Sequence, residues 1–380
     1  MKIIHLADSH LGFSSYSRLD EHGQNRIEEM VYSGFEKAIE QIIKANPDAV
    51  VHAGDVFHHV RPKIKPLFIF QRGLQRLVEA AIPVIIISGN HDAPKSFNQT
   101  SPFRLFEGLR DVHIAQRYSY ERFEVGDHCF HCIPFCLEPQ DYLTEFGEIK
   151  RSGRDVLVMH GMVESLKNQK MRSVGEHELN DSLLKSDFDY IALGHYHGQA
   201  QVSANAYYSG SVEYFNFGEA RDVKGMLLVD LETGKASNVP VKPNYMIDHP
   251  PIDCSGMRSD EIAEIIMDMC HEDEISDRMV RINLKNVNRV AYRSIDQGKL
   301  NRLGGAAIYF KIRLDFCDEE DRIERPVDRR MLHVDFAGFL GERRSANLIP
   351  ETIKDEVVSY GTEIMKKAVL ARQKETTDAP

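Results

Sequence analysis

The sequence predicts an α/β protein: a two-sheet α/β sandwich, followed by a smaller α+β domain and a C-terminal helix. Two observations support this fold class. Short apolar runs alternate with amphipathic helical segments through the first hundred residues, a rhythm typical of a largely parallel sheet with right-handed crossovers. The chain of 380 residues is also longer than one ordinary domain.

Residue spacing defines the first elements. Apolar runs predict strands at 2–7, 48–52 and 84–88, and the mostly β-branched third run is typical of a strand buried on both faces. We expect Asn25 to cap a helix that continues to about residue 46, and a second helix at 67–81. The apolar stripe of the first helix comprises Ile27, Val31, Phe35, Ile39 and Ile42 or Ile43.

The middle of the chain predicts a second sheet. Hairpin-spaced strands are expected within 112–135, and further strands at 155–159, 190–193, 207–211 and 226–230, the last two packing into that second sheet. Short helices are expected at 101–109 and 138–149.

The composition shifts near residues 241–251, where Pro, Asn, Asp and His accumulate. Such a shift is typical of a domain boundary. We therefore expect a first domain over 1–243, an α+β domain over 244–337 and a helical tail over 338–380. The tail contains an amphipathic pattern at 351–373, with its stripe at Ile353, Val357, Tyr360, Ile364 and Ala368.

Composition excludes several classes of protein. No run of eighteen apolar residues exists and the N-terminus is not a signal peptide, so we expect a cytoplasmic protein that does not associate with membranes. Six cysteines are too few for a disulfide scaffold. The net charge of −11 argues against a broad, non-specific nucleic-acid surface. Local basic clusters are interpreted as solvated faces; they lie at Arg61/Lys63/Lys65, Lys150/Arg151/Arg154 and Lys167/Lys170/Arg172.

Side chains of the kinds that bind metals follow five of the predicted strands. Because active sites of open α/β sheets lie at the carboxyl ends of strands, we expect these residues to form one site. Oxygen and imidazole donors without a thiolate suit Mn, Fe or Zn. So many ligands suit two ions about 3.5–4 Å apart, with Asp55 as the bridge. The set comprises Asp8, His10, Asp55, Asn90, His160, His195 and His197.

The pattern D-x-H, G-D-x-x-H, G-N-H-D, H-G and G-H-x-H resembles the calcineurin-like metallophosphoesterases over residues 1 to about 235. It is most similar to the Mre-eleven/SbcD branch, the nucleases of DNA double-strand-break repair. His58 and Asp92 favour this branch. The protein phosphatases of the superfamily instead carry an arginine after G-D, and G-N-H-E at the third motif.

The resemblance implies a two-metal hydrolysis of DNA phosphodiester bonds, with 3′-5′ exonuclease and single-strand endonuclease activity. It implies a nucleoid-associated enzyme in a prokaryote, acting with an ABC-type ATPase of the Rad-fifty or SbcC type. It also implies that the second domain caps the active site and contacts DNA, and that helices carrying Leu67, Phe68, Phe70, Leu74, Phe103 and Phe106 form a homodimer. Packing of those apolar residues in the core is the alternative.

By motif, the resemblance also assigns residue roles. His91 would act in phosphodiester cleavage, and His58 would be a catalytic-site residue that orients the DNA. Of two divalent ions, with Mn²⁺ preferred over Fe or Zn, one would bind Asp8, His10, Asp55 and His197, and the other Asp55, Asn90, His160 and His195.

Three other interpretations stay open at this point. The chain could be a phosphomonoesterase or cyclic-nucleotide phosphodiesterase on the same scaffold, or a non-catalytic interaction protein. The C-terminal stripe could bind the ATPase or pack on its own domain. Finally, Cys129-x-x-Cys132, with Cys136, His128 and His131, could be a zinc or redox motif, although we prefer buried thiols in a strand.

Overall fold

The computed structural model describes residues 1–15, 19, 22–94, 99–166, 178–185, 187–242, 244–317, 356, 359–361 and 363–364. Most of the predicted helix at 351–373 lies outside these residues, as do most of the expected tail at 338–380 and the basic cluster at Lys167/Lys170/Arg172.

The first sheet is mixed and six-stranded, with the strand order β14-β13-β1-β2-β3-β4. Strands β1 to β4 run parallel to one another, and β13 pairs antiparallel with β1. The three strands predicted in the first hundred residues are therefore confirmed. The members are β1 (Lys2–Leu6), β2 (Ala49–His52), β3 (Val84–Ile87), β4 (Val112–Ala115), β13 (Met226–Asp230) and β14 (Lys235–Val239).

The second sheet has the order β11-β12-β10-β7-β6-β5, and its four inner strands are parallel. A further strand pair, β8 (Met162–Val163) with β9 (Glu178–Leu179), stands apart from it. The members of the second sheet are β5 (Glu121–Val125), β6 (His128–Ile133), β7 (Asp155–His160), β10 (Tyr190–Gly194), β11 (Ala200–Gln201) and β12 (Ala206–Tyr208).

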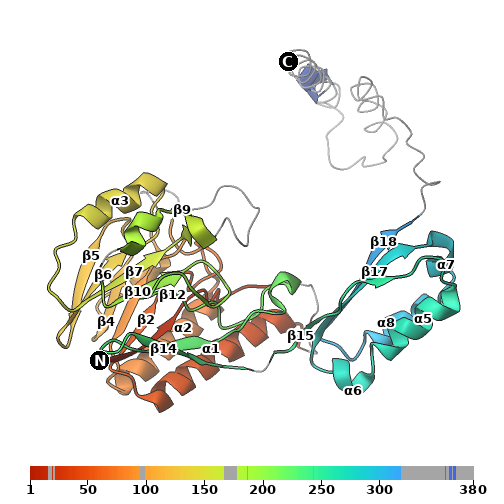
Figure 1. Ribbon diagram of the computed structural model, residues 1–380, viewed down its shortest axis with the longest axis horizontal. Coiled ribbons are helices and arrows are strands. Elements are labelled where there is room, and N and C mark those ends of the chain that lie inside the picture. The colour runs from red at the N-terminus through yellow and green to blue at the C-terminus, as the bar shows by residue number, and fades with distance from the viewer. Residues whose placement is uncertain are drawn as a thin grey trace. The chain divides into compact units, whose positions relative to one another are not determined.

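The two sheets and the helices form four layers. Alternate residues of β1 separate the faces: Ile4 packs with the helices α1 (Arg26–Ala45) and α2 (Ile64–Glu79), whereas Ile3 packs between the sheets. On the outer face of the second sheet, Tyr142 of α3 (Pro139–Gly147) packs with Leu157. Figure 1 shows α3 on the opposite side of the strands from α1 and α2. The α/β sandwich is confirmed.

Helix α1 begins and ends as its sequence predicts. The Asn25 side chain accepts hydrogen bonds from the backbone N–H groups of Ile27 and Glu28, at 3.0 and 3.1 Å. Asn46 ends the helix in the left-handed conformation, with φ +46°. The predicted stripe is buried from Ile27 through Ile42; its part from Val31 on packs on the first sheet, whereas Ile27 packs in a separate cluster with Tyr214 and Phe217.

Two predictions about local elements were wrong. Residues 226–230 form β13 in the first sheet rather than a strand of the second, because pairing with β1 is a long-range choice that local pattern does not encode. The helix expected at 101–109 is a single 3-10 turn, η1 (Pro102–Leu105), which Ser101 caps. The other short turns are η2 (Asp181–Lys185) and η3 (Phe217–Glu219).

The region after residue 245 has α+β character. Its sheet has the order β15-β17-β16, and β18 pairs with β17. Contacts divide the chain into two units, the first drawn from 1–250, 265–283 and 297–313 and the second from 251–264, 284–296 and the chain beyond 313. The boundary at residue 243 stays a prediction. The elements are β15 (Met246–Asp248), β16 (Ile252–Asp253), α5 (Ser259–Asp268), α6 (Glu272–Ile275), β17 (Met279–Val287), α7 (Arg289–Arg293), α8 (Gln297–Leu303) and β18 (Tyr309–Phe316).

In the part of the chain that the structure describes, no helix combines the length and the hydropathy that crossing a bilayer requires.

Asp155, at the start of β7, is a buried anchor of the second sheet. Its carboxylate accepts hydrogen bonds from the backbone N–H groups of Ser152 and Gly153, at 3.0 and 2.7 Å, and from His131 Nε2 at 2.9 Å. Burial alone would raise the pKa of Asp155, but the His131 and Ser152 donors outweigh it and hold that pKa below its ordinary value.

We expect Asp155→Asn to lower the free energy of unfolding at pH 7 by about 1–3 kcal/mol, because an amide cannot satisfy all of these donors. The native pKa is depressed, so the carboxylate stabilises the fold above about pH 4 and loses that effect as the pH falls further. The difference between the variant and wild type, measured by urea unfolding, should therefore narrow in acid. The control Asp187→Asn removes a carboxylate whose side chain is 99% exposed, and should change stability by less than about 0.5 kcal/mol.

Candidate metal centre

All seven expected ligands lie just beyond or at the carboxyl ends of parallel strands. Three strands of the first sheet, β1, β2 and β3, and two of the second, β7 and β10, supply them. Because the two sheets pack face to face, these strand ends meet at one edge of the sandwich. The structure thus brings together residues that are separated by almost two hundred positions in the chain.

The first group of donors comprises Asp8, His10 and His197, with one donor atom from each lying within 4.8 Å of the others. His10 Nε2 and His197 Nε2 are 3.1 Å apart. Both oxygens of Asp8 accept a hydrogen bond from the backbone N–H of His195, at 3.0 and 3.1 Å. This contact ties the first strand of one sheet to the β10 loop of the other.

The second group comprises Asp55, His160 and His195, again with donor atoms within 4.8 Å. Asn90 belongs to it, because its Oδ1 is 3.0 Å from His160 Nε2 and 2.9 Å from His195 Nδ1. His160 Nδ1 donates to the Ala53 carbonyl at 2.8 Å, so its Nε2 faces the group.

Asp55 contacts both groups. Its Oδ2 is 3.7 Å from His10 Nε2 and 3.4 Å from His160 Nε2, while its Oδ1 accepts a hydrogen bond of 2.8 Å from the His91 backbone N–H. A carboxylate in this position can bridge two cations, as the sequence predicts.

Unusual backbone conformations hold these side chains in place. Asp8, His10, Asp55 and His195 all have positive φ, at +54°, +43°, +55° and +97°. Non-glycine residues rarely adopt such values, and they concentrate where function requires a fixed geometry. Hydrogen bonds of 3.0 Å from Asp8 N to the Gly54 carbonyl and from His10 N to the Asp55 carbonyl fix the first two loops together.

Asp92 acts as a bracket between the β2 and β3 loops, a role that its sequence position did not reveal. It is fully buried. Its Oδ1 accepts a 2.6 Å hydrogen bond from Gly89 N, and its Oδ2 accepts bonds from Val56 N at 2.5 Å and Phe57 N at 3.3 Å. Asp92 therefore sets the position of Asp55 from the adjoining loop.

The protonation of the site fits cation binding. Burial raises the pKa of Asp8 to about 6. Burial lowers the pKa of His160, but the carboxylate of Asp55 outweighs it and raises that pKa to about 9. His160 therefore holds a proton at neutral pH that a bound divalent ion would displace, whereas burial lowers the pKa of His10 and leaves its ring neutral. The donors are carboxylate, amide and imidazole, which suits two divalent cations of the transition-metal type.

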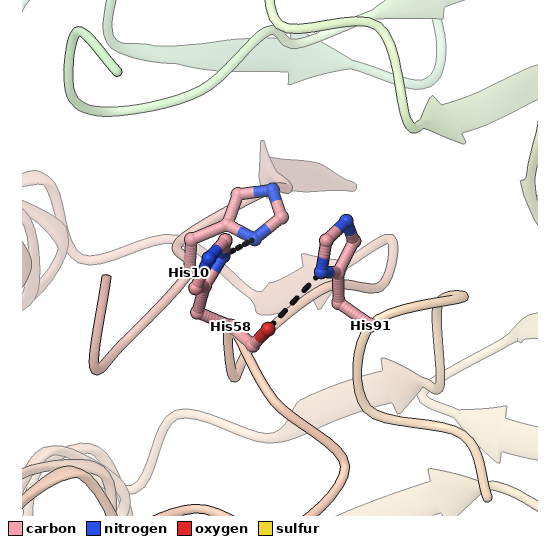
Figure 2. Close-up of side chains that lie close together, drawn as sticks. All are labelled: His10, His58 and His91. Atoms are coloured by element: carbon pink, nitrogen blue, oxygen red, sulfur yellow. Dashed lines mark hydrogen bonds between the residues drawn. The ribbon is translucent and has the colours of Figure 1, made fainter. Parts of the chain in front are cut away.

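His58 and His91 lie beside His10 in a third group of donors (Figure 2). His91 Nδ1 donates to the His58 carbonyl at 3.0 Å, which fixes the tautomer and leaves Nε2 as the free edge of the ring. The His58 and His91 rings are stacked, with centroids 5.1 Å apart. His58 Nδ1 is 3.3 Å from His10 Nδ1, so His58 also braces an expected ligand.

The geometry of the cysteine motif argues against a metal site. Along β6, Cys129 and Cys132 are three residues apart and point to opposite faces, with Cys132 in the core between the sheets. Cys129, His131 and Asp155 approach one another. However, Arg122 Nε donates to Cys129 Sγ at 2.9 Å, and a guanidinium there opposes a cation.

A comparison with family models identifies the class of protein. The model of the calcineurin-like phosphoesterase family matches residues 1–224, more than half of the chain. The chain therefore belongs to the calcineurin-like phosphoesterases, as its motifs and its paired donor groups indicate.

Curated relatives narrow the similarity further. The chain is 29% identical over 274 residues to the DNA double-strand break repair protein Mre11 of Methanococcus maripaludis, covering 65% of this chain and 69% of that protein. It is 31% identical over 242 residues to Mre11 of Methanocaldococcus jannaschii, covering 60% and 62%. It is 26% identical over 273 residues to the SbcD component of the nuclease SbcCD of Staphylococcus saprophyticus, covering 64% and 69%. The matches thus span about two thirds of these relatives.

We expect Gly89→Ala to abolish high-affinity divalent-metal binding. A Cβ at Gly89 would overlap the carboxylate and backbone nitrogen of Asp55, so the expected bridging ligand must move. Calorimetric titration of Mn²⁺ should show at least a tenfold loss of affinity, about the scale of losing a supporting contact. Gly147→Ala is the control, because nothing lies within 4 Å of a Cβ there. Equal Mn²⁺ affinity in the two variants would contradict the assignment of Asp55.

Proposed function

We propose that this chain is a two-metal DNA nuclease of double-strand-break repair, with 3′-5′ exonuclease and single-strand endonuclease activity. The observation that carries the proposal is the position of Asp55 between two groups of donors, with His91 and His58 beside them. The names of the relatives, Mre11 and nuclease SbcCD, support a nuclease over other phosphoesterases. Such an enzyme would be associated with the nucleoid in a prokaryote.

The proposed ligands of one ion are Asp8, His10, Asp55 and His197, and those of the other are Asp55, Asn90, His160 and His195. Imidazole-rich, thiolate-free donors favour Mn²⁺, with Fe or Zn as alternatives. When bound, two such cations supply Lewis acidity and neutralise the charge on a phosphodiester. The chain's own contribution is to hold these donors rigidly, through the Asp92 bracket and the positive-φ backbone.

His91 is the proposed proton donor to the leaving 3′ oxygen, or the residue that steadies the phosphate oxygens. Because the His58 carbonyl accepts from Nδ1–H, Nε2 is left for the substrate; as the proton donor, His91 would be the imidazolium, which carries its second proton on Nε2. A positioned acid of this kind contributes roughly 10²–10⁴-fold in rate. His58, stacked on His91 and adjacent to His10, is proposed to orient both the DNA and the expected ligand.

Labelled single- and double-stranded DNA, incubated with Mn²⁺, Mg²⁺ or a chelator, tests the activity. We expect shortening of 3′ ends and internal cuts in single strands with Mn²⁺, and neither with the chelator. Hydrolysis of small phosphate esters without any cleavage of DNA would favour the phosphomonoesterase or cyclic-nucleotide phosphodiesterase alternative. Absence of both activities in a metal-loaded protein would favour a non-catalytic interaction protein.

We further propose a homodimer through α2 and η1. Three large apolar side chains are exposed there: Ile64 at 85%, Phe68 at 55% and Leu105 at 69%. Ile64 and Phe68 are four residues apart and so share one face of the helix. Phe70, Leu74, Phe103 and Phe106 are instead buried in the core, which is the role that the core-packing alternative predicts for them.

The proposed partner is an ABC-type ATPase of the Rad50 or SbcC type. A binding element within residues 338–380 is supported by Tyr360 and Ile364, four residues apart and 69% and 51% exposed. A pull-down with the cognate ATPase, comparing the full chain with a chain truncated at Gly341, tests this element. Equal capture of both chains would place ATPase binding elsewhere.

We expect His91→Gln to lose DNA cleavage by roughly 10²-fold or more while keeping two bound Mn²⁺ ions and DNA affinity. The reason is that the hydrogen bond from His91 to Asp55 comes from the backbone N–H, which the substitution retains. Single-turnover cleavage and metal content are the measurements. His59→Gln is the control, because His59 is exposed beside the same loop. Loss of metal from the His91 variant would contradict its role.

The double variant Ile64→Glu/Phe68→Glu should shift the protein from dimer to monomer. Charges on this face would have to be desolvated within the interface, a cost of several kcal/mol that a dimer of ordinary size does not tolerate. Sedimentation at micromolar concentration is the measurement. Val290→Glu alters a comparably exposed apolar residue of the second unit, at 72%, and should leave the oligomeric state unchanged. A wild-type monomer would exclude the dimer.

A further inference from the structure

His197 is held at two points by residues that the motif analysis did not single out. Its ring Nδ1 donates to Glu219 Oε1 at 3.0 Å. Its backbone carbonyl accepts a 2.9 Å hydrogen bond from Lys224 Nζ. Both residues lie in the segment after β12, 22 and 27 positions beyond His197 in the sequence and outside the five strand-end motifs.

Glu219 is a buried carboxylate, and each of its two oxygens accepts two hydrogen bonds. It is 6% exposed. Besides His197, its Oε1 accepts from Asn216 Nδ2 at 2.6 Å, while its Oε2 accepts from Lys224 Nζ at 2.7 Å and from Phe215 N at 3.1 Å. Asn216 Nδ2, Lys224 Nζ and Phe215 N can only donate, and the Lys224 ammonium supplies a positive charge. The Glu219 carboxylate is therefore ionised and acts only as an acceptor.

Lys224 is likewise buried, and all three of its N–H groups are hydrogen-bonded. It is also 6% exposed, and its three N–H groups bond Glu219, the His197 carbonyl and Ser211 Oγ, at 2.7, 2.9 and 2.9 Å. A buried ion pair of this kind contributes little to stability compared with an apolar pair, which favours a role in specifying geometry. Here the geometry specified is that of His197.

The consequence for His197 is a fixed tautomer. Because an ionised carboxylate cannot donate, the hydrogen in the contact with Glu219 belongs to His197 Nδ1. Nε2 then carries the lone pair and lies 3.1 Å from His10 Nε2, within the first donor group. His160 differs, because its Nδ1 donates to the neutral Ala53 carbonyl, and His10 Nδ1 faces the His58 ring. A carboxylate partner makes an imidazole a more basic ligand than a neutral partner does.

We propose that Glu219 and Lys224 are positioning residues that orient His197 as a ligand and selectively strengthen binding of the ion held by Asp8, His10 and His197. This inference rests on the two-cation site of the proposed function. It adds a prediction which that function does not make: the two ions respond unequally to the loss of Glu219.

The experiment titrates Mn²⁺ into chelator-treated, full-length protein by calorimetry, and records the electron paramagnetic resonance spectrum of the coupled Mn²⁺ pair. For Glu219→Gln we expect one Mn²⁺ to bind as in wild type and the other 10–100-fold more weakly, with the coupled-pair signal lost at low Mn²⁺. DNA cleavage should recover at raised Mn²⁺ concentration, because kcat depends on both ions being present rather than on Glu219 itself.

Glu213→Gln is the matched control. Glu213 is also a buried carboxylate in the same segment with a lysine partner, Lys242 at 2.5 Å, but it does not contact the candidate ligands. The Glu213→Gln protein should bind both ions with wild-type affinity. Circular dichroism checks folding; if Glu219→Gln does not fold, Glu219→Asp, which keeps the charge but shortens the reach to His197, is measured in its place with the same expectation.

Two outcomes separate this inference from the proposed function. Wild-type protein that binds no Mn²⁺ would overturn the two-cation site and the inference with it. In the second outcome, wild type and the Glu219 variant both bind two Mn²⁺ ions, and both affinities of the variant lie within threefold of wild type. That result would overturn the positioning role alone.

Discussion

The carboxylate of Asp55 is the constraint on which the candidate site depends. It is buried, it approaches histidines of both donor groups, and its other oxygen accepts the His91 backbone N–H. A charged group so far from water persists only when it is fully partnered. The hydrogen bonds of Asp92, the glycine at 89 and the positive φ of Asp55 itself can all be understood as means of keeping that carboxylate in one position, while Gly54 leaves room for the His160 ring.

The two-sheet architecture explains how so many polar groups can share one small volume. Both faces of each sheet are largely apolar, so the polar donors of the site gather where strands end. The first sheet supplies Asp8, Asp55 and Asn90, and the second supplies His160 and His195. The Asp8 carboxylate then joins the sheets directly through the His195 backbone. The donor side chains are therefore attached to backbone that the packed core holds rigid.

Much of this could be predicted from the sequence, because its signals are local. The Asn25 cap, the apolar stripe of α1 and the polar residues after each strand all lie within a few positions of what they determine. The partner of β13 could not, because strand pairing is decided by packing over two hundred residues. Glu219 was missed for the same reason: nothing near it marks a role, and only the fold places it beside His197. For Cys129 and Cys132 the preferred interpretation, buried thiols in a strand, is confirmed: both lie in β6 and are buried and unpaired.

The order of donors along the chain has a consequence for biosynthesis. The candidate site draws on residues after β1, and the proposed positioning residues Glu219 and Lys224 come more than two hundred residues later, shortly before β13 and β14 of the first sheet. Domains generally fold as units once their full length is available. The candidate donors of a nascent chain are therefore expected to come together only after about residue 230 has left the ribosome, when the sheets that position them are complete.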